Sequence, residues 1–565
     1  MRVVAQPVSS VAVKAYAGTT GVLLAMDVMT SARKGLLGFA VEREILSGQH
    51  KGKTKWLEGM LNFPGLPHFP GQPVASNVAP LQKFRWSDYT VFPGTEYAYA
   101  IHPVYGHPGK PTIEAGPRVA VKTGEGDGTH FVIFNRAAAA SQAFTREFPP
   151  VAIDLYAAKK AKRKLTSVPF PPEAYDWLSR GLLAQILGFL AKAEDANWAV
   201  DVAIYEYELL KIREAVAEVA TRGVRVRILY HAKPGDEQTA QNEASLRVPP
   251  LPQANVLKVA RKTQKIMHDK FIVLSRLRNG QRDPQAVLCG STNFTENGVY
   301  RQANVVHIAR DPTIARQYLA QFETLVRTAA DPKQTKVDVT KSNPINPAAP
   351  IFVGFSPRSG QTDLQEFINI IQGSKRDVLF CTVFQLFPGV QKALLGKPHD
   401  DILRFGLQNT RSTITGFHKD RTASFVATAF LSEGLEGWLK ESTAGQKGNI
   451  LVHTKLVVAD FTSDSPIVIS GSHNLSKPAS EANDENYLIL RCRPGDTDIA
   501  DAYGVELMRL YDHYRFRWYV QDGSRKPHRS QDKEPPTLDL TDAWTKPYFG
   551  GDKLKTADRL RFIGI

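Results

Sequence analysis

The sequence at residues 266–274 reads IMHDKFIVL, and GSTN follows it at residues 290–293. A second stretch, residues 451–460, reads LVHTKLVVAD and is followed by GSHN at residues 471–474. Each copy consists of His-x-Lys, an apolar run, a loop and Gly-Ser-x-Asn. The apolar runs predict two central, buried strands, and each of them carries a histidine and a lysine.

The histidine and the lysine of each pair share one face of a strand, because residues i and i+2 point the same way. His268 therefore lies beside Lys270, and His453 lies beside Lys455. A polar pair in a core strand needs either partners or a function. A hydrogen-bonded core histidine would explain one copy, but two copies that each precede Gly-Ser-x-Asn favour a functional site. The glycine permits close backbone approach, and the serine and asparagine supply hydrogen bonds.

The regions around the two motifs show the same order of helical and extended segments. The first region starts near residue 175 with a predicted helix over residues 177–192, and a Pro-, Asn- and Lys-rich linker follows at residues 331–350. Repeated element order predicts an internal duplication of one structural unit. We therefore expect an α/β fold whose two α/β/α halves, residues 175–330 and 350–520, pack pseudo-symmetrically.

Residues 1–155 have a different pattern from the rest of the chain. Short apolar runs separated by Pro- and Gly-containing turns, the last of them at residues 130–134, predict a β-rich accessory domain. The pattern resembles a fibronectin-type or immunoglobulin-like β-sandwich. This region contains no catalytic constellation, so we expect a structural or partner-binding role for it.

Two further segments complete the chain. Residues 151–175 include the basic run KKAKRK at 159–164, which is typical of a solvated connector, although a polyanion could also bind there. Residues 521–565 form a polar, Pro-rich tail. We expect three aromatic residues of this tail to dock on the body of the protein, namely Trp544, Tyr548 and Phe549.

Composition restricts the class of protein. A chain of 565 residues is too long for one core, and its 42% hydrophobic and 22% charged residues are typical of soluble globular proteins. No apolar run is long enough for a bilayer and no secretory signal is evident, so we expect a cytoplasmic protein. The three cysteines argue against a disulfide framework. The net charge of +15 would attract nucleic acid or an anionic lipid surface, or simply solvate the surface.

The two motifs resemble those of the phospholipase D superfamily, in which His-x-Lys-x4-Asp precedes Gly-Ser-x-Asn. The resemblance covers roughly residues 175–520. The second copy matches in full, with an acidic-then-Asn element after it, at His453, Lys455, Asp460, Gly471, Ser472, Asn474 and Glu485. The first copy matches at His268, Lys270, Gly290, Ser291 and Asn293. It departs from the family at Ser275, where the motif has Asp, and at Ala303, where we expect the counterpart of Glu485.

The resemblance implies a metal-independent phosphodiesterase that uses no cofactor. Two lysines and two asparagines would clamp the phosphate, namely Lys270, Lys455, Asn293 and Asn474. One histidine would attack phosphorus and the other would act as acid and then base, which the family assigns to His268 and His453 respectively. Glu485 is expected to orient His453, whereas only Glu296 lies near His268 in sequence. Ser291, Ser472 and Asp460 would support the site.

The substrate class stays open between a phospholipid and a nucleic acid, and the reaction between hydrolysis and transfer to an alcohol. The basic charge favours nucleic acid, whereas two halves in one chain are also typical of lipid-cleaving enzymes. A third interpretation is a catalytically impaired module that binds phosphate or a polyanion, since the first motif is incomplete. The two retained His-x-Lys pairs favour an enzyme.

Overall fold

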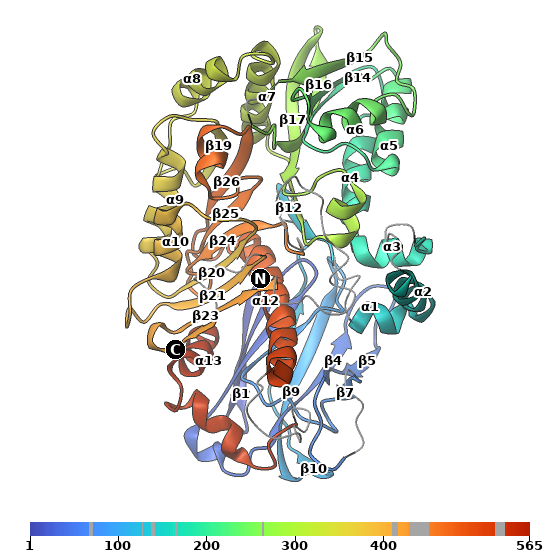
Figure 1. The fold of residues 1–565 in the computed structure, drawn as a ribbon. Coiled ribbons are helices and arrows are strands. Elements are labelled where there is room, and N and C mark those ends of the chain that lie inside the picture. The colour runs from blue at the N-terminus through green and yellow to red at the C-terminus, as the bar shows by residue number, and fades with distance from the viewer. Residues whose placement is uncertain are drawn as a thin grey trace.

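The structure is a computed structural model, and it describes residues 1–66, 72–126, 128–136, 142–161, 163, 168–262, 265–409, 416–428, 451–525 and 537–564. These residues form a mixed α/β protein with two large sheets and a β-rich N-terminal region (Figure 1). None of the helices in these ranges combines the length and the apolar character needed to span a bilayer.

Two antiparallel sheets make up the N-terminal region. The first has the strand order β1 (Arg2–Val8), β2 (Val11–Ala17), β3 (Val22–Val28) and β8 (Arg85–Asp88). The second has the order β10 (Lys110–Ile113), β9 (Glu96–His107), β4 (Gly38–Ile45) and β5 (Thr54–Trp56), and β11 (Arg118–Lys122) also pairs with β9. A small pair, β6 (Glu58–Gly59) and β7 (Val74–Ala75), and the turn η1 (Thr30–Arg33) lie beside them. Alternate residues of both sheets, such as Val13 and Ile101, share one apolar core.

The first large sheet contains the first motif. Its strand order is β12 (His130–Phe134), β18 (Val305–Ala309), β17 (Gln281–Gly290), β16 (Lys270–Arg278), β13 (Trp198–Ile204), β14 (Arg225–His231) and β15 (Val256–Arg261). The sequence groups residues 130–134 with the N-terminal strands, but β12 pairs along its whole length with β18. All five residues of β12 are buried, so this strand needs cover on both faces, and the large sheet supplies it.

Helices surround this sheet, and one predicted helix is divided in two. They are α1 (Gln142–Glu147), α2 (Pro149–Lys160), α3 (Pro172–Ser179), α4 (Leu182–Ala191), α5 (Leu210–Thr221), α6 (Glu237–Ser245), η3 (Asn297–Arg301), α7 (Pro312–Arg327) and α8 (Pro332–Ser342). The single helix predicted over residues 177–192 is wrong, because Arg180 and Gly181 adopt left-handed backbone angles and separate α3 from α4.

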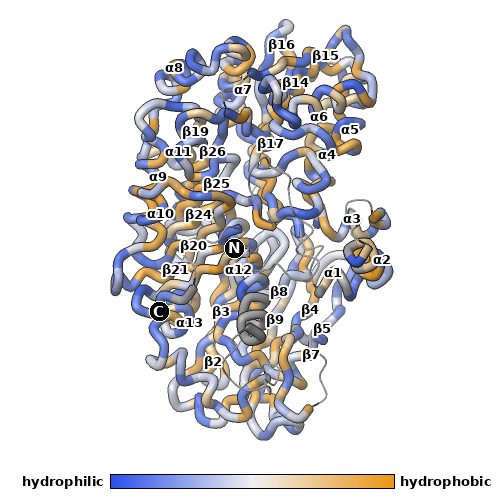
Figure 2. The backbone as a smooth tube through the Cα atoms, in the orientation of Figure 1, coloured by the Kyte–Doolittle hydropathy of each residue, from blue (hydrophilic) through white to orange (hydrophobic). Residues whose placement is uncertain are grey.

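The two predicted connectors also contain helices. In residues 151–175, α2 buries Leu155 and Ala158 in the core of the first sheet; residues 162 and 164–167 of this segment lie outside the described residues. In residues 331–350, the side chain of Asp331 caps α8, and Val339 is buried. Figure 2 shows α8 as a largely hydrophilic segment, which explains why its composition indicates a linker.

The second large sheet contains the second motif. Its strand order is β19 (Ile351–Ser356), β26 (Glu485–Arg491), β25 (Ile467–Gly471), β24 (Lys455–Ala459), β20 (Asp377–Thr382), β21 (Leu403–Gln408), β23 (Ala423–Ala427) and β22 (Gly416–His418). Its helices are α9 (Thr362–Gln372), α10 (Pro388–Leu395), η4 (Lys419–Arg421), α11 (Lys477–Glu481) and α12 (Asp498–Arg525). One apolar core includes residues of β16 and β24, so the two motif strands belong to one packed body.

The helix α12 contacts the N-terminal region and both halves of the chain that carry the motifs (Figure 1). Its Glu506 accepts hydrogen bonds from Thr20 Oγ1 (2.7 Å) and Arg180 Nη1 (2.8 Å). Its Tyr511 donates to Ser424 Oγ at 2.6 Å. The N-terminal strands, the helices of the first sheet and the second sheet therefore all contact one helix.

In the C-terminal tail, residues 526–536 lie outside the described residues, and the described part contains the end of α12, η7 (Asp542–Tyr548) and α13 (Lys553–Ile563). Trp544 and Tyr548 are buried in the core of the N-terminal sheets, and Trp544 Nε1 donates to the carbonyl of Leu36 at 2.8 Å. The hydroxyl of Tyr16 in β2 donates to the carbonyl of Phe562 at 2.6 Å. The tail thus docks mainly on the N-terminal strands.

Candidate active site

The two motif histidines each stand just before a strand and are held by the opposite half of the chain. The backbone N–H of His268 donates to the carbonyl of Asp484 at 2.8 Å, and that of His453 donates to the carbonyl of Ala303 at 2.9 Å. Isolated bridges pair Met267 with Asp484 and Ala303 with Val452. In each half, the segment that follows Gly-Ser-x-Asn therefore crosses to the His-x-Lys motif of the other half.

The two imidazoles face each other. Their ring centroids lie 6.3 Å apart, at an angle of 74°. Each histidine is only 4% exposed, so both rings are largely withdrawn from solvent. Tyr205 packs against the other side of the first ring, with 5.5 Å between the centroids of Tyr205 and His268.

A carboxylate orients His268. Its Nδ1 lies 2.6 Å from Oε2 of Glu485, which is fully buried. The same Oε2 accepts a hydrogen bond from Ser472 Oγ at 2.7 Å, and Oε1 accepts one from Asn483 Nδ2 at 3.1 Å. The expectation that Glu485 orients His453 is wrong, because the segment that carries Glu485 crosses to the first motif. Glu296 is not the partner either, since it pairs with Arg301 at 3.0 Å.

An amide orients His453. Its Nδ1 lies 2.9 Å from Oδ1 of Asn304 and 3.2 Å from the carbonyl of Ser291. The Nδ2 of Asn304 donates to the carbonyl of Gly298 at 2.9 Å, and its Oδ1 accepts from Ser291 Oγ at 2.8 Å. These contacts fix the amide with its oxygen toward His453, so Nδ1 of the histidine is the donor.

Asn304, and not Ala303, is the counterpart of Glu485. In the first sheet Gly290 pairs with Val306, which lies two residues after Asn304. In the second sheet Gly471 pairs with Tyr487, which lies two residues after Glu485. Each motif serine donates to the residue at this position. The expected match of Ala303 with Glu485 is therefore one residue out of register. The first half has an amide, Asn304, where the second half has an acid, Glu485.

The lysines of the two motifs lie beside the histidines, and the asparagines of the two motifs are also buried. Lys270 Nζ donates to the carbonyl of His268 at 2.6 Å, and Lys455 Nζ donates to that of His453 at 2.7 Å. Both ammonium-bearing side chains and both motif asparagines are at most 8% exposed. Asn293 Nδ2 donates to Oε2 of Glu206 at 2.6 Å. Glu206 was missed, although it lies two residues after the end of β13, where polar residues of a site commonly lie.

The pKa values of the two histidines reflect these surroundings. Desolvation lowers the pKa of His268 to about 4, against the raising effect of Glu485. The pKa of His453 is lowered well below its usual value, by desolvation first and then by the charges of Lys455 and Lys270, against the raising effect of its hydrogen bond to the carbonyl of Ser291. Burial acts to raise the pKa of Glu485, but the charge and hydrogen bond of His268 outweigh it and the pKa is lowered. At neutral pH and without an anion, both imidazoles are therefore neutral and Glu485 is ionised.

The residue between His268 and Lys270 also differs from its counterpart. Asp269 is fully buried, and its Oδ1 accepts a hydrogen bond from Asn486 Nδ2 at 2.8 Å. Desolvation and the nearby charge of Asp484 raise the pKa of Asp269 to about 8, so this acid is mainly protonated at neutral pH. Asp484 itself forms a buried ion pair with Arg261 at 2.8 Å.

Asp460 does not join the histidines. It lies just after β24, and its Oδ1 accepts hydrogen bonds from the backbone N–H groups of Lys375 (2.8 Å) and Arg376 (2.7 Å). It therefore holds the loop before β20, which is a structural role. Across the described ranges, no group of three or more His, Cys, Asp or Glu side chains is arranged to hold a metal ion.

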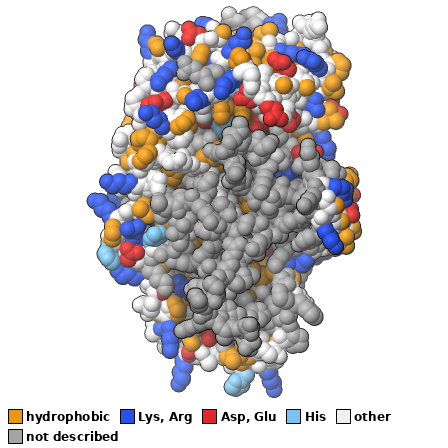
Figure 3. All heavy atoms as spheres, in the orientation of Figure 1, with side chains coloured by type: hydrophobic (Ala, Val, Ile, Leu, Met, Phe, Trp, Pro, Cys, Tyr) orange, Lys and Arg blue, Asp and Glu red, His pale blue; other side chains and the backbone are white. Residues whose placement is uncertain are grey.

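Figure 3 shows Lys and Arg side chains spread around one face of the molecule rather than gathered in one patch, with Asp and Glu interspersed among them. This distribution does not by itself favour a nucleic-acid substrate over a lipid.

Comparison with known proteins supports the chemistry suggested by the motifs. Residues 189–326 match the family model described as "Cardiolipin synthase, PLD-like domain", and this segment includes the first motif. Comparison with curated proteins gives no match.

Three solved structures illustrate the structural matches. Phosphatidylserine synthase from Haemophilus influenzae Rd KW20 is 12% identical, with 68% of this chain and 93% of that chain covered and a TM-score of 0.42. NucT from Helicobacter pylori is 21% identical over 27% of this chain and 90% of that chain, with a TM-score of 0.22. Polyphosphate kinase from Porphyromonas gingivalis is 11% identical over 54% of this chain, with a TM-score of 0.37, and the match spans only 42% of that kinase. Residues 189–326 match a phospholipase D-like family model, in agreement with the resemblance seen in the first motif.

Proposed function

We propose that this chain is a phosphodiesterase that cleaves or transfers a phosphodiester through a covalent phosphohistidine. The observation that carries the proposal is the pair of facing histidine rings, 6.3 Å apart, of which only His268 contacts a carboxylate. Two histidines on opposite sides of one phosphorus can divide the work, with neutral His268 as nucleophile and protonated His453 as acid.

In the first step His268 is the nucleophile. Glu485 accepts a hydrogen bond from the Nδ1–H of His268, so the lone pair is on Nε2, and the carboxylate stabilises the positive charge that develops on the ring. The bond from Nε2 to phosphorus forms while the bond from phosphorus to the leaving alkoxide breaks. His453 donates its Nε2 proton to that alkoxide. The anionic substrate supports this proton, because a nearby negative charge raises the pKa of an imidazole.

In the second step His453 is the base. It accepts a proton from water or an alcohol, whose oxygen attacks the phosphohistidine. The new bond from oxygen to phosphorus replaces the bond from His268 Nε2. His268 returns to the neutral state, and His453 again carries the Nε2 proton with which the first step began. Water yields hydrolysis and an alcohol yields transfer.

Protein groups supply the charge that phosphoryl transfer needs. Lys270 and Lys455 provide two ammonium groups beside the histidines. An amide nitrogen has two hydrogens, so Asn293 can bind Glu206 with one and phosphate with the other. We propose that Asn474 donates to the phosphate from the second half. The mechanism therefore does not call for a metal ion.

We infer further that the two large sheets are pseudo-symmetric phospholipase D-like halves. Corresponding backbone hydrogen bonds at His268 and His453, and corresponding serine contacts at Asn304 and Glu485, support this relation. The N-terminal strands would form a sandwich-like accessory domain, which ends before β12 rather than at residue 155.

The substrate we propose is a phospholipid or a nucleic acid. Plasmid DNA, RNA and phosphatidylcholine vesicles, offered in parallel with EDTA, separate these two. Cleavage of nucleic acid alone would exclude the lipid, and choline release alone would exclude the nucleic acid. Activity that requires a divalent ion would contradict the metal-independent mechanism.

The second candidate is a phosphate- or polyanion-binding module, and the amide at Asn304 favours it, because that position lacks the acid found at Glu485. A folded protein that binds all three substrates and cleaves none would support this module and overturn the enzyme.

A further inference from the structure

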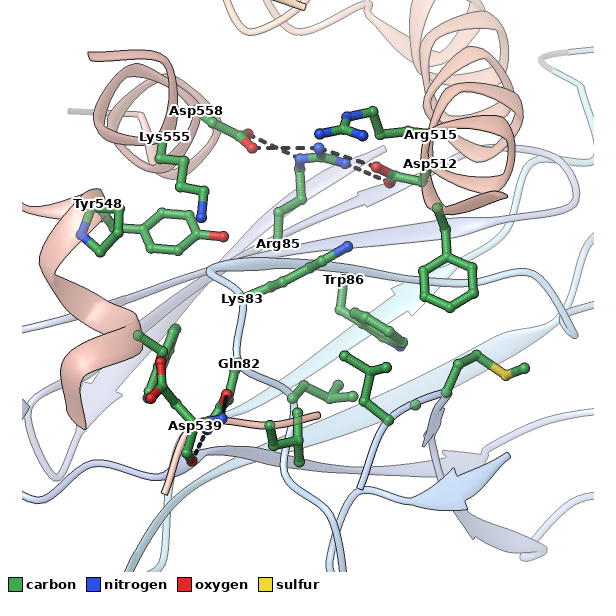
Figure 4. A pocket seen from close by; sticks show the side chains of 18 of the residues that line it. Gln82, Lys83, Arg85, Trp86, Asp512, Arg515, Asp539, Tyr548, Lys555 and Asp558 are labelled. Atoms are coloured by element: carbon green, nitrogen blue, oxygen red, sulfur yellow. Dashed lines mark hydrogen bonds and ion pairs between the residues drawn. The ribbon is translucent and has the colours of Figure 1, made fainter. Parts of the chain in front are cut away.

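A second site lies away from the histidine pair, between the N-terminal sheets and the C-terminal elements. It is a cavity of about 490 Å³, within the range of small-molecule pockets. Its walls come from the segment that leads into β8, from the C-terminal part of α12, and from η7 and α13 (Figure 4). Because these segments are far apart in sequence, the cavity exists only in the docked protein.

Two of the three acids that line the cavity, Asp512 and Asp558, are already neutralised, whereas Asp539 forms no ion pair among the described residues. Arg85 lies between two carboxylates, at 2.7 Å from Asp512 Oδ2 and 3.0 Å from Asp558 Oδ1 (Figure 4). The two acids also hold the pKa of Arg85 well above its usual value against the effect of burial. These carboxylates are therefore engaged with a fixed cation of the protein.

Lys83 has no such partner. Its ammonium lies 5.5 Å from the centroid of the Trp86 ring, and among the described residues it forms no ion pair with a carboxylate. The side chain is exposed and lines the cavity, so a ligand can reach it. On the opposite wall, the ammonium of Lys555 lies 5.2 Å from the centroid of Tyr548.

The rest of the wall is largely apolar. Besides the aromatic rings, the cavity is lined by Met60, Leu61, Leu81, Leu538 and Leu554. A ligand that matches this surface combines an anionic head group for Lys83 with an apolar tail for the leucines and aromatic rings. A cationic head group would meet four basic side chains, from Lys83, Arg85, Arg515 and Lys555, against one carboxylate that Arg85 does not neutralise, that of Asp539.

We propose that this cavity binds a single-chain amphiphile with an anionic head group, such as a fatty carboxylate. The head group pairs with Lys83, and the chain lies along the apolar wall. This site is separate from the proposed phosphodiesterase site, and it does not depend on that activity.

Calorimetric titration of the full chain with sodium dodecanoate, below its critical micelle concentration, tests the proposal. We expect one saturable site for dodecanoate and much weaker binding of dodecyltrimethylammonium, which has the same tail and the opposite charge. Acetate, which has the head group without the tail, should not bind measurably. Equal binding of the two amphiphiles, or no binding of dodecanoate, would overturn the proposal.

Variants test whether dodecanoate binds at Lys83. Lys83→Met keeps the length of the side chain and removes its charge, so dodecanoate should bind about tenfold more weakly. Lys83→Arg should retain most of the affinity. Lys110→Met, at an exposed lysine of β10 outside the cavity, is the matched control and should change nothing. Unchanged affinity in Lys83→Met would contradict the assignment, and His268→Ala should bind dodecanoate normally whether or not the proposed activity is correct.

Discussion

The two halves of the histidine site differ at the residue that contacts each imidazole, and the difference fits the two proposed roles. Glu485 places a buried negative charge 2.6 Å from His268, whereas Asn304 places a neutral amide 2.9 Å from His453. A carboxylate stabilises an imidazole that becomes positive, so it suits the nucleophile. An amide fixes the tautomer without stabilising the charged ring, so the other histidine is a stronger acid once it is protonated. Similar motifs thus support unequal chemistry.

The largest expected effect comes from removing either histidine. His268→Ala and His453→Ala should each reduce turnover by at least about 10⁴-fold, because nucleophile and acid act as one unit. Turnover of the substrate found in the parallel assay is the measurement. His107→Ala, at an exposed histidine of β9, is the control and should retain full activity. An active His268→Ala variant would refute the shared site.

Neutralising the carboxylate should cost more than removing the amide. Glu485→Gln keeps the shape but removes the charge that supports His268, and we expect a loss in kcat of about 10²–10³-fold. Asn304→Ala should cost only about tenfold, since the carbonyl of Ser291 still accepts from His453 Nδ1. If the amide variant lost more activity than the acid variant, the assignment of nucleophile and acid would have to be exchanged.

Giving His453 a carboxylate partner, as His268 has, should move the pH dependence of activity. Asn304→Asp places a carboxylate near His453, and this raises the pKa of that histidine. Since His453 must be protonated in the first step, activity falls as pH rises through its pKa, so the alkaline limb should move upward by about one pH unit. The pH profile of kcat/KM is the measurement, with Asn304→Ser as the uncharged control. A limb that stays in place would indicate that His453 is not the acid.

The smallest effect concerns the middle residue of each motif, which is Asp269 in one half and Thr454 in the other. The pKa of Asp269 is raised to about 8, so in the folded protein it binds a proton that the unfolded chain releases above pH 4. Its stabilising contribution is complete below the unfolded pKa and is lost as pH rises toward 8.

Asp269→Asn should remove this dependence while keeping an oxygen for Asn486. We expect a gain in the free energy of unfolding of about 1 kcal/mol at pH 8, and a smaller gain at pH 5. Urea unfolding at the two pH values is the test. An equal change at both values would show that Asp269 does not titrate in this range.

Local sequence was sufficient for the features that depend on neighbours along the chain. The apolar runs after each His-x-Lys form β16 and β24. Gly290 and Gly471 have φ of 147° and 152°, and a Cβ at either would collide with the carbonyl of Val305 or Asn486. The residues of each motif lie close together along the chain, so the motifs could be found without a structure, although the clash that requires glycine comes from the paired strand.

Only the tertiary structure decided which half serves which histidine. Glu485 is 32 residues from His453 and 217 from His268, yet it contacts the more distant one. The reason is that residues 303–304 and 484–485 cross between the sheets, and such a crossing leaves no periodic pattern in the sequence. The same holds for β12, whose partner strand β18 begins more than 170 residues later in the sequence. It also holds for Lys83, because its cavity forms only after the tail has docked. Sequence identified the candidate reacting groups, and packing between distant segments assigned their partners.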